Sequence, residues 1–228
     1  MQVIIFDDAQ HVAENAAEWV AELINKKSTP VLGLATGSTP ISLYQQLVTK
    51  HKAGLLSFKN TTSFNLDEYL GIDEKNEQSY RHFMNKNLFD HVDIDKSKTY
   101  LPTCNQGENP RSQGLAYEGK IKQAGGVDLQ ILGIGANGHI GFNEPTSSLA
   151  SRTRIKTLTQ QTLTDNSRLF DQNEFQDKIS SSDVYNQYFF QRIYKFLKEN
   201  KNQKIKFKYI KKKISEKKYY PKNYYYSW

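Results

Sequence analysis

Residues 30–48 read PVLGLATGSTPISLYQQLV and indicate the class of fold. An apolar run at 31–35 is followed by a short polar loop and then by apolar residues at helical spacing. Pro40 suits the first turn of that helix, because the first N–H groups of a helix make no intrahelical hydrogen bond. The stretch therefore predicts a strand, a loop and a helix in succession, which is the repeating unit of a parallel sheet.

Units of the same kind flank this stretch on both sides. Apolar runs predict buried strands, and amphipathic segments predict helices. The expected strands are 3–6, 31–35, 62–66 and 127–134, and the expected helices are 8–27, 40–48, 80–89 and 114–124. The alternation predicts an α/β domain with a mostly parallel sheet and helices on both faces. Because ligands of such sheets bind beyond the carboxyl ends of the strands, the loops after Ala35, Leu66 and Ile134 should share one edge.

The first of these loops, Thr36-Gly37-Ser38-Thr39, lies between a strand and a helix. Backbone N–H groups and hydroxyls at a helix N-terminus can hold an anion, and a sugar phosphate would fit there. The loop matches neither the Walker A pattern nor the dinucleotide-binding glycine fingerprint. An ordinary capped turn is the alternative interpretation.

The second loop begins with two neighbouring carboxylates, Asp67 and Glu68. Adjacent side chains on an extended chain point to opposite sides, so only one of them should face the ligand edge. A partly desolvated carboxylate at that edge could remove a proton next to a carbonyl carbon. The alternative is an acidic turn exposed to solvent.

The third loop, GIGANGHIGFNEP at residues 133–145, is the richest in glycine. Glycines allow the backbone to approach a ligand closely, and the imidazole of His139 suits proton transfer near neutral pH. Asn137 and Glu144 could orient that imidazole. A structural histidine in a tight turn and a metal ligand are the alternatives, but no cysteine or second histidine lies nearby in the sequence.

Further along, SSLASRTRIK at residues 147–156 alternates hydroxyl and cationic side chains, and Arg168 follows. Such a pattern can form a second anion site through charge-assisted hydrogen bonds, with a solvated basic strand as the alternative. Arginine also clamps phosphate with two donors at once.

The charge of the chain is divided unevenly between two segments. The net charge is +7 overall, but residues 1–176 carry −3 and residues 177–228 carry +10. The second segment has 13 Lys and 9 Tyr but no Gly or Ala, so it differs in composition from the domain before it. A single cysteine, Cys104, favours a reducing, cytoplasmic location, and neither a signal sequence nor a membrane span is expected.

The motifs LATGSTP, FNLDEYLG, GIGANGHIGFNEP and SSLASRTRIKTLT resemble, in order and spacing, those of glucosamine-6-phosphate deaminases, also called isomerases, over residues 1 to about 176. The resemblance implies a Rossmann-like three-layer α/β sandwich and a cytosolic enzyme with no metal or organic cofactor. It implies conversion of D-glucosamine 6-phosphate and water into D-fructose 6-phosphate and ammonia, in amino-sugar catabolism. On this basis the enzyme is expected to be a hydrolase.

The resemblance also implies roles for individual residues. His139, with Glu144 behind it and Asn137 beside it, would open the sugar ring. Asp67 would then move the C2 proton to C1. Thr36, Gly37, Ser38 and Thr39 would hold the phosphate, with Arg168 as a cationic clamp.

Three further residues, Ser147, Arg154 and Lys156, match positions that bind N-acetylglucosamine 6-phosphate as an allosteric activator in hexameric members. A homo-oligomer is therefore expected. No membrane partner and no specific nucleic-acid partner are expected.

The resemblance ends where residues 177–228 begin, so the domain of residues 1–176 is expected to be incomplete, with the C-terminal part of the family fold missing or replaced. One hypothesis is that 177–228 arose from an out-of-frame reading. Two alternative functions stay open: a 6-phosphogluconolactonase-like hydrolase, and an inactive relic whose basic tail binds polyanions.

Overall fold

The centre of the molecule is a parallel four-stranded sheet. The computed structural model describes residues 4–105, 107–134, 138–143, 147–148 and 151–158, together with the backbone of 183–186. The sheet has the order β4-β2-β1-β5. Its strands are β1 (Val31–Leu34), β2 (Thr62–Asn65), β4 (Thr99–Tyr100) and β5 (Leu129–Gln130). All three neighbouring pairs are parallel, which confirms the predicted α/β class.

Within the described residues four α-helices lie against this sheet, and short polar side chains begin three of them. They are α1 (Ala9–Lys26), α2 (Ile41–Lys52), α3 (Tyr80–Asn87) and α4 (Pro110–Gln123). Asp8, Ser79 and Asn109 accept hydrogen bonds from backbone N–H groups in the first turns of α1, α3 and α4. Two short 3₁₀ helices, η1 (Phe89–His91) and η2 (Lys96–Lys98), connect α3 to β4.

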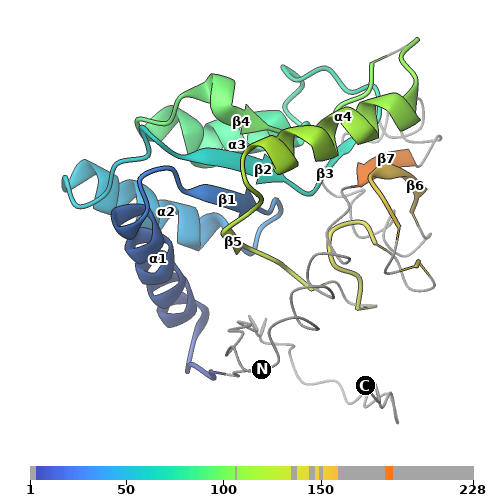
Figure 1. Cartoon of the computed structure of the whole chain (residues 1–228). Coiled ribbons are helices and arrows are strands. Elements are labelled where there is room, and N and C mark those ends of the chain that lie inside the picture. The colour runs from blue at the N-terminus through green and yellow to red at the C-terminus, as the bar shows by residue number, and fades with distance from the viewer. Residues whose placement is uncertain are drawn as a thin grey trace, which may run out of the picture.

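The helices cover both faces of the sheet, as expected for a three-layer sandwich (Figure 1). On one face, residues of α1, α2 and α3 pack on Leu32 and Leu34 of β1. On the other face, Tyr117 and Ile121 of α4 pack on Val31 and Phe64. Alternate residues of β1 thus enter opposite layers of the core, which is why the whole strand is apolar and buried.

The glycine within β1 makes room for a side chain from the neighbouring strand. A Cβ atom placed on Gly33 would lie 1.8 Å from Oε1 of Gln130, which is paired with Gly33 across the sheet. No side chain fits at this position without displacing Gln130.

A second sheet contains β3 (Asp67–Tyr69), β7 (Asp183–Asn186) and β6 (Arg154–Thr157), in the order β3-β7-β6. Both pairings are antiparallel, and β7 lies between the other two strands. Because β7 belongs to the basic segment 177–228, part of that segment is joined by its backbone to the domain before it.

Two expected strands differ from the structure. Residues 4–6 form no strand, and Ile5 is 88% exposed, because the described part of the chain places no backbone beside them to complete a ladder. The strand expected at 127–134 shrinks to Leu129–Gln130, which pair only with Leu32 and Gly33 of β1. Ile134, at the expected end of that strand, is 58% exposed.

Cys104 is buried. Over the described ranges of the chain, no helix is both long and apolar enough to span a membrane.

Candidate active site

The loop between β1 and α2 is held open at the carboxyl end of the sheet. The hydroxyl of Tyr44, from α2, accepts a hydrogen bond from the N–H of Ala35 at 3.1 Å and donates one to the carbonyl of the same residue. Gly37 has a φ of +99°, a conformation that glycine adopts without strain. Ser38 and Thr39 are exposed, and the N-cap residue Pro40 supplies no capping side chain. The loop therefore presents backbone and hydroxyl groups to solvent, as an anion site requires.

Asp67 and Glu68 lie on β3, just beyond the end of β2, and both are buried, at 7% and 3% exposure. The alternative of a solvated acidic turn is therefore wrong. Burial and the neighbouring charge of Glu68 raise the pKa of Asp67 to about 8, although a hydrogen bond from the Phe142 N–H lowers it in part. Such a carboxyl group can both take up and release a proton near neutral pH.

Glu68 points away from Asp67 and reaches the start of α3. Its Oε1 accepts the N–H groups of Tyr69 at 2.9 Å and Tyr80 at 3.0 Å, and its Oε2 accepts that of Arg81 at 3.0 Å. Burial raises the pKa of Glu68 to about 7, although these three N–H groups and the Arg81 guanidinium lower it. The guanidinium itself donates to Oγ1 and the carbonyl oxygen of Thr99, at 2.7 and 2.9 Å.

The glycine-rich loop comes back to Asp67 through its second half. The backbone N–H of Phe142 donates to the Asp67 carboxyl group. Phe142 lies in a tight turn of this loop, in which the N–H of Asn143 donates to the carbonyl of Ile140 at 3.1 Å. His139 lies in this loop and is half-buried. Two expected elements of the site, Asp67 and the histidine loop, are thus in contact.

Aromatic rings enclose this contact. The ring of Phe142 lies 6.1 Å from that of Tyr69 and 6.0 Å from that of Tyr80, and the two tyrosine rings lie 5.0 Å apart. The buried Leu158 belongs to the same cluster. These apolar groups lower the polarity around Asp67 and contribute to its raised pKa.

Three expected site residues, Asn137, Glu144 and Arg168, lie outside the described residues. The expected anion site near β6 is partly described. Arg154 donates to Oδ1 of Asn143 at 3.1 Å and to the carbonyl of Arg152 at 3.3 Å. Ser147 and Lys156 are half-buried.

Two contacts of the site were not expected from the sequence. One is the capping of α3 by Glu68. The sequence indicates this contact only by an acidic residue that precedes the helix. The other is Tyr117 of α4, whose hydroxyl donates to the carbonyl of Asn65 at 2.6 Å and so holds the end of β2 directly before Asp67.

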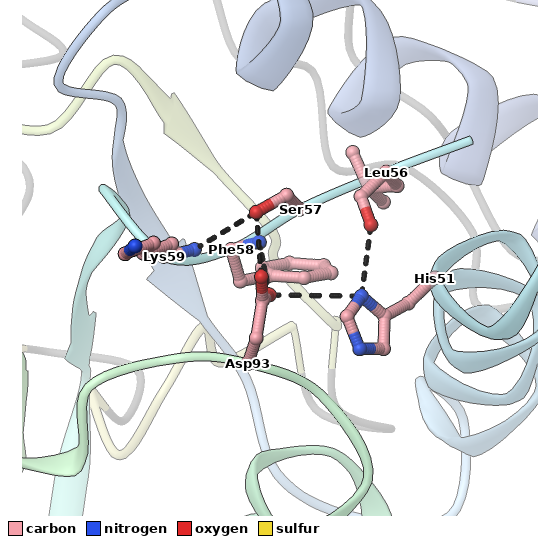
Figure 2. Close-up of polar contacts among 6 residues, drawn as sticks. All are labelled: His51, Leu56, Ser57, Phe58, Lys59 and Asp93. Atoms are coloured by element: carbon pink, nitrogen blue, oxygen red, sulfur yellow. Dashed lines mark hydrogen bonds and ion pairs between the residues drawn. The ribbon is translucent and has the colours of Figure 1, made fainter. Parts of the chain in front are cut away.

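A separate group of Ser, His and Asp side chains includes His51 from the last turn of α2 (Figure 2). The hydroxyl of Ser57 donates to Oδ2 of Asp93 at 2.6 Å, while Nδ1 of His51 lies 2.8 Å from the carbonyl oxygen of Leu56 and 3.6 Å from Oδ1 of Asp93. A nucleophilic triad needs the hydroxyl to contact the imidazole, and here it contacts the carboxylate instead. The N–H of Phe58 also donates to Asp93, at 2.6 Å. Asp93 therefore fastens the loop that contains Ser57 and Phe58.

The described side chains include no group of three His, Cys, Asp or Glu residues placed to hold a metal ion.

The sequence of this chain is similar to those of known proteins. The family profile described as glucosamine-6-phosphate isomerases/6-phosphogluconolactonase matches residues 7–164. A glucosamine-6-phosphate deaminase of Colwellia psychrerythraea is 84% identical over 180 residues, and one of Pseudoalteromonas translucida is 60% identical over 180 residues. Each alignment covers 79% of this chain and 67% of the relative, so the chain spans about two thirds of the length of these relatives.

Solved structures support the same grouping. A monomeric glucosamine-6-phosphate deaminase has a TM-score of 0.74 and 37% identity, covering 82% of this chain and 76% of the other. A 6-phosphogluconolactonase from Thermotoga maritima has a TM-score of 0.56 at 20% identity, covering 71% of this chain and 72% of the other, which shows a shared fold.

These relatives overturn one expectation. Proteins at 84% and 60% identity are named deaminases, and the family profile is described first by its isomerases, so classing the chain as a hydrolase is wrong. The chain belongs to the family of glucosamine-6-phosphate isomerases and 6-phosphogluconolactonases, and within it to the enzymes similar to glucosamine-6-phosphate deaminase.

Proposed function

We propose that this chain converts D-glucosamine 6-phosphate and water into D-fructose 6-phosphate and ammonia. The observation that carries the proposal is the buried carboxyl group of Asp67, which is held by the Phe142 N–H in the loop that also contains His139. The proposed chemistry uses acid and base groups of the protein and requires neither a metal nor an organic cofactor.

In the proposed sequence, His139 first opens the pyranose by moving a proton between the anomeric hydroxyl and the ring oxygen, with Glu144 and Asn137 orienting the imidazole. Asp67 then removes the proton on C2 of the open aldehyde and delivers it to C1, while a proton of the C2 amino group passes to O1, which leaves a C1 hydroxyl and an imine at C2. Water adds to that imine and ammonia leaves. A single carboxyl group suits both halves of the transfer, because its raised pKa lies near the working pH.

The phosphate of the substrate is proposed to lie at the loop Thr36-Gly37-Ser38-Thr39, with Arg168 as a clamp. Support comes from the position of the loop between β1 and the N-terminus of α2, where backbone N–H groups favour an anion. A phosphate bound there would fix one end of the sugar while its C1 and C2 atoms reach Asp67.

Regulation and assembly form the second part of the proposal. Ser147, Arg154 and Lys156 are proposed to bind N-acetylglucosamine 6-phosphate as an activator in a homo-oligomer, a hexamer. Arg154 and Lys156 are alternate residues of β6 and share one face of it, and Arg154 contacts Asn143 in the histidine loop. Sedimentation with and without the activator tests assembly, because a chain that stays monomeric, like the similar solved deaminase, would refute this part.

A cytoplasmic location completes the proposal, and the buried single cysteine, Cys104, is consistent with it.

The test of the proposed reaction is an assay of the whole chain with D-glucosamine 6-phosphate, measuring ammonia and D-fructose 6-phosphate in equal amounts. A parallel assay with 6-phosphogluconolactone measures the rival activity of the same family. Equal release of both products from the amino sugar supports the proposal. Turnover of the lactone alone, or no turnover by a folded chain, would refute it.

A further inference from the structure

Glu68 is a buried carboxyl group on β3 that the proposed reaction does not use. Glu68 is 3% exposed, and such burial of a carboxyl group is costly unless hydrogen bonds compensate it. It accepts three backbone N–H groups, from Tyr69, Tyr80 and Arg81. Each donor favours the ionised carboxylate and offsets part of the effect of burial, which still raises the pKa of Glu68 to about 7. Glu68 is therefore negatively charged in the pH range above 7, where Asp67 titrates.

Two of these donors belong to the first turn of α3. The N–H groups of Tyr80 and Arg81 have no acceptor within the helix, and the N-cap residue Ser79 already accepts the N–H of His82 at 2.9 Å. Glu68 therefore completes the capping of α3 from a different element, and a negative charge at a helix N-terminus is favourable. The contact fastens β3 to α3.

Asp67 is the neighbour of Glu68 on the same short strand, so whatever fastens Glu68 also fixes the direction of Asp67. Asp67 accepts the Phe142 N–H, and its side chain points to the opposite side of β3. Among the described residues, the hydroxyls of Tyr80 from α3 and Tyr117 from α4 also act electrostatically with Asp67. Both are neutral near pH 7, because burial raises the pKa of each well above its ordinary value.

We propose that Glu68 is a positioning residue for the proton transfer assigned to Asp67: its carboxylate, held by the N–H groups at the start of α3, fixes β3 and keeps a negative charge beside Asp67. The role in proton transfer rests on the proposed function. Burial is the larger cause of the raised pKa of Asp67, and the charge of Glu68 raises it further, because it disfavours a second negative charge next to it. The Arg81 guanidinium moderates this effect, since it also interacts with Glu68.

The variant Glu68→Gln tests the proposal, because it keeps the length of the side chain and removes the charge. The readout is the titration of the Asp67 carboxyl carbon by NMR in the whole ¹³C-labelled chain. We expect the Asp67 midpoint to fall by about one pH unit in Glu68→Gln. Glu77→Gln removes the same charge from an exposed position close in sequence and should leave the midpoint unchanged.

A second variant, Glu68→Asp, keeps the charge but shortens the arm, and it serves if Glu68→Gln does not fold. Its Asp67 midpoint should stay well above that of an ordinary aspartate, while the amides of Tyr80 and Arg81 exchange faster with solvent. The proposal is overturned if the midpoint in folded Glu68→Gln equals that of the unmodified chain, or if it falls to an ordinary value in folded Glu68→Asp.

The titration needs no turnover, so it decides the role of Glu68 even if the chain is inactive on glucosamine 6-phosphate. If the chain is active, the acidic limb of kcat/KM should move to lower pH by the same amount in Glu68→Gln. A merely structural role would lower the rate at every pH and leave this limb in place.

Discussion

The backbone N–H of Phe142 donates a hydrogen bond to the buried carboxyl group of Asp67. This contact joins β3, at the end of the parallel sheet, to the glycine-rich loop that carries His139. It brings two of the sequence motifs into one site, and it is the structural reason for assigning them to one reaction.

The titration of Asp67 predicts how stability changes with pH. The pKa of Asp67 is raised to about 8 in the folded chain and is about 3.9 in an unfolded one. The folded state therefore binds this proton more tightly, and the resulting stability is complete below the unfolded pKa and is lost as the pH rises through the folded pKa. Relative to Asp67→Asn, the unmodified chain should lose a few kcal/mol between pH 5 and pH 9. Urea unfolding of both chains at the two pH values measures this, and an equal difference at both would contradict it.

Gly33 predicts a steric effect in the sheet. Gly33→Ala places a Cβ against the amide end of the Gln130 side chain, which must move and lose its hydrogen bond to the Ile131 carbonyl, so we expect a loss of about 1 kcal/mol in the free energy of unfolding. Gly119→Ala, in α4, meets nothing within 4 Å and should be neutral or stabilising. Adding Gln130→Ala to Gly33→Ala should restore part of the loss. If all three chains unfold at the same urea concentration, the contact is not what requires glycine.

Tyr44 predicts an effect on substrate binding. Tyr44→Phe removes both hydrogen bonds between α2 and Ala35, where the proposed phosphate loop begins. We expect KM for D-glucosamine 6-phosphate to rise several-fold with a smaller change in kcat, because binding of the phosphate is lost equally in substrate and transition state. Tyr100→Phe makes the same chemical change on β4, away from this loop, and should leave KM unchanged. A kcat loss without a KM change would argue against a phosphate role for the loop.

The position of β7 predicts that part of the basic segment protects the site. β3 pairs with β7 through Asp67, Glu68 and Tyr69, and β7 lies within residues 177–228. A chain that ends at residue 176 should show hydrogen exchange on β3 faster by about tenfold or more, because a lost ladder exposes its amides. Amides of β2, which pairs with β1 and β4, serve as the control. Unchanged exchange on β3 would show that the segment adds nothing to the site.

The helix α1 and the strand β1 were predictable because their signals are local. The helix expected at 8–27 is observed at Ala9–Lys26, with Asp8 as its cap, and the strand expected at 31–35 is observed at Val31–Leu34. Periodic apolar residues and a capping side chain act within one segment, so the sequence contains the information in one place.

The short strands depend on partners that are far away in the sequence. β3, β4, β6 and β7 have two to four residues each, and they exist because another segment supplies hydrogen bonds. The strand expected at 3–6 failed for the same reason, since an apolar run becomes a strand only beside another backbone. The burial of Glu68 could not be predicted either, because its carboxyl oxygens accept N–H groups of a helix that begins twelve residues later.

The identity of Asp67 as the group that moves the C2 proton is the central claim. It is tested most directly by the rate of ammonia release from D-glucosamine 6-phosphate by the whole chain and by its Asp67→Asn variant, with circular dichroism showing that both are folded. Asparagine keeps the shape but cannot take up the proton, so the account predicts a rate loss of about 10²–10⁴-fold. A folded Asp67→Asn chain that keeps the rate of the unmodified chain would contradict it.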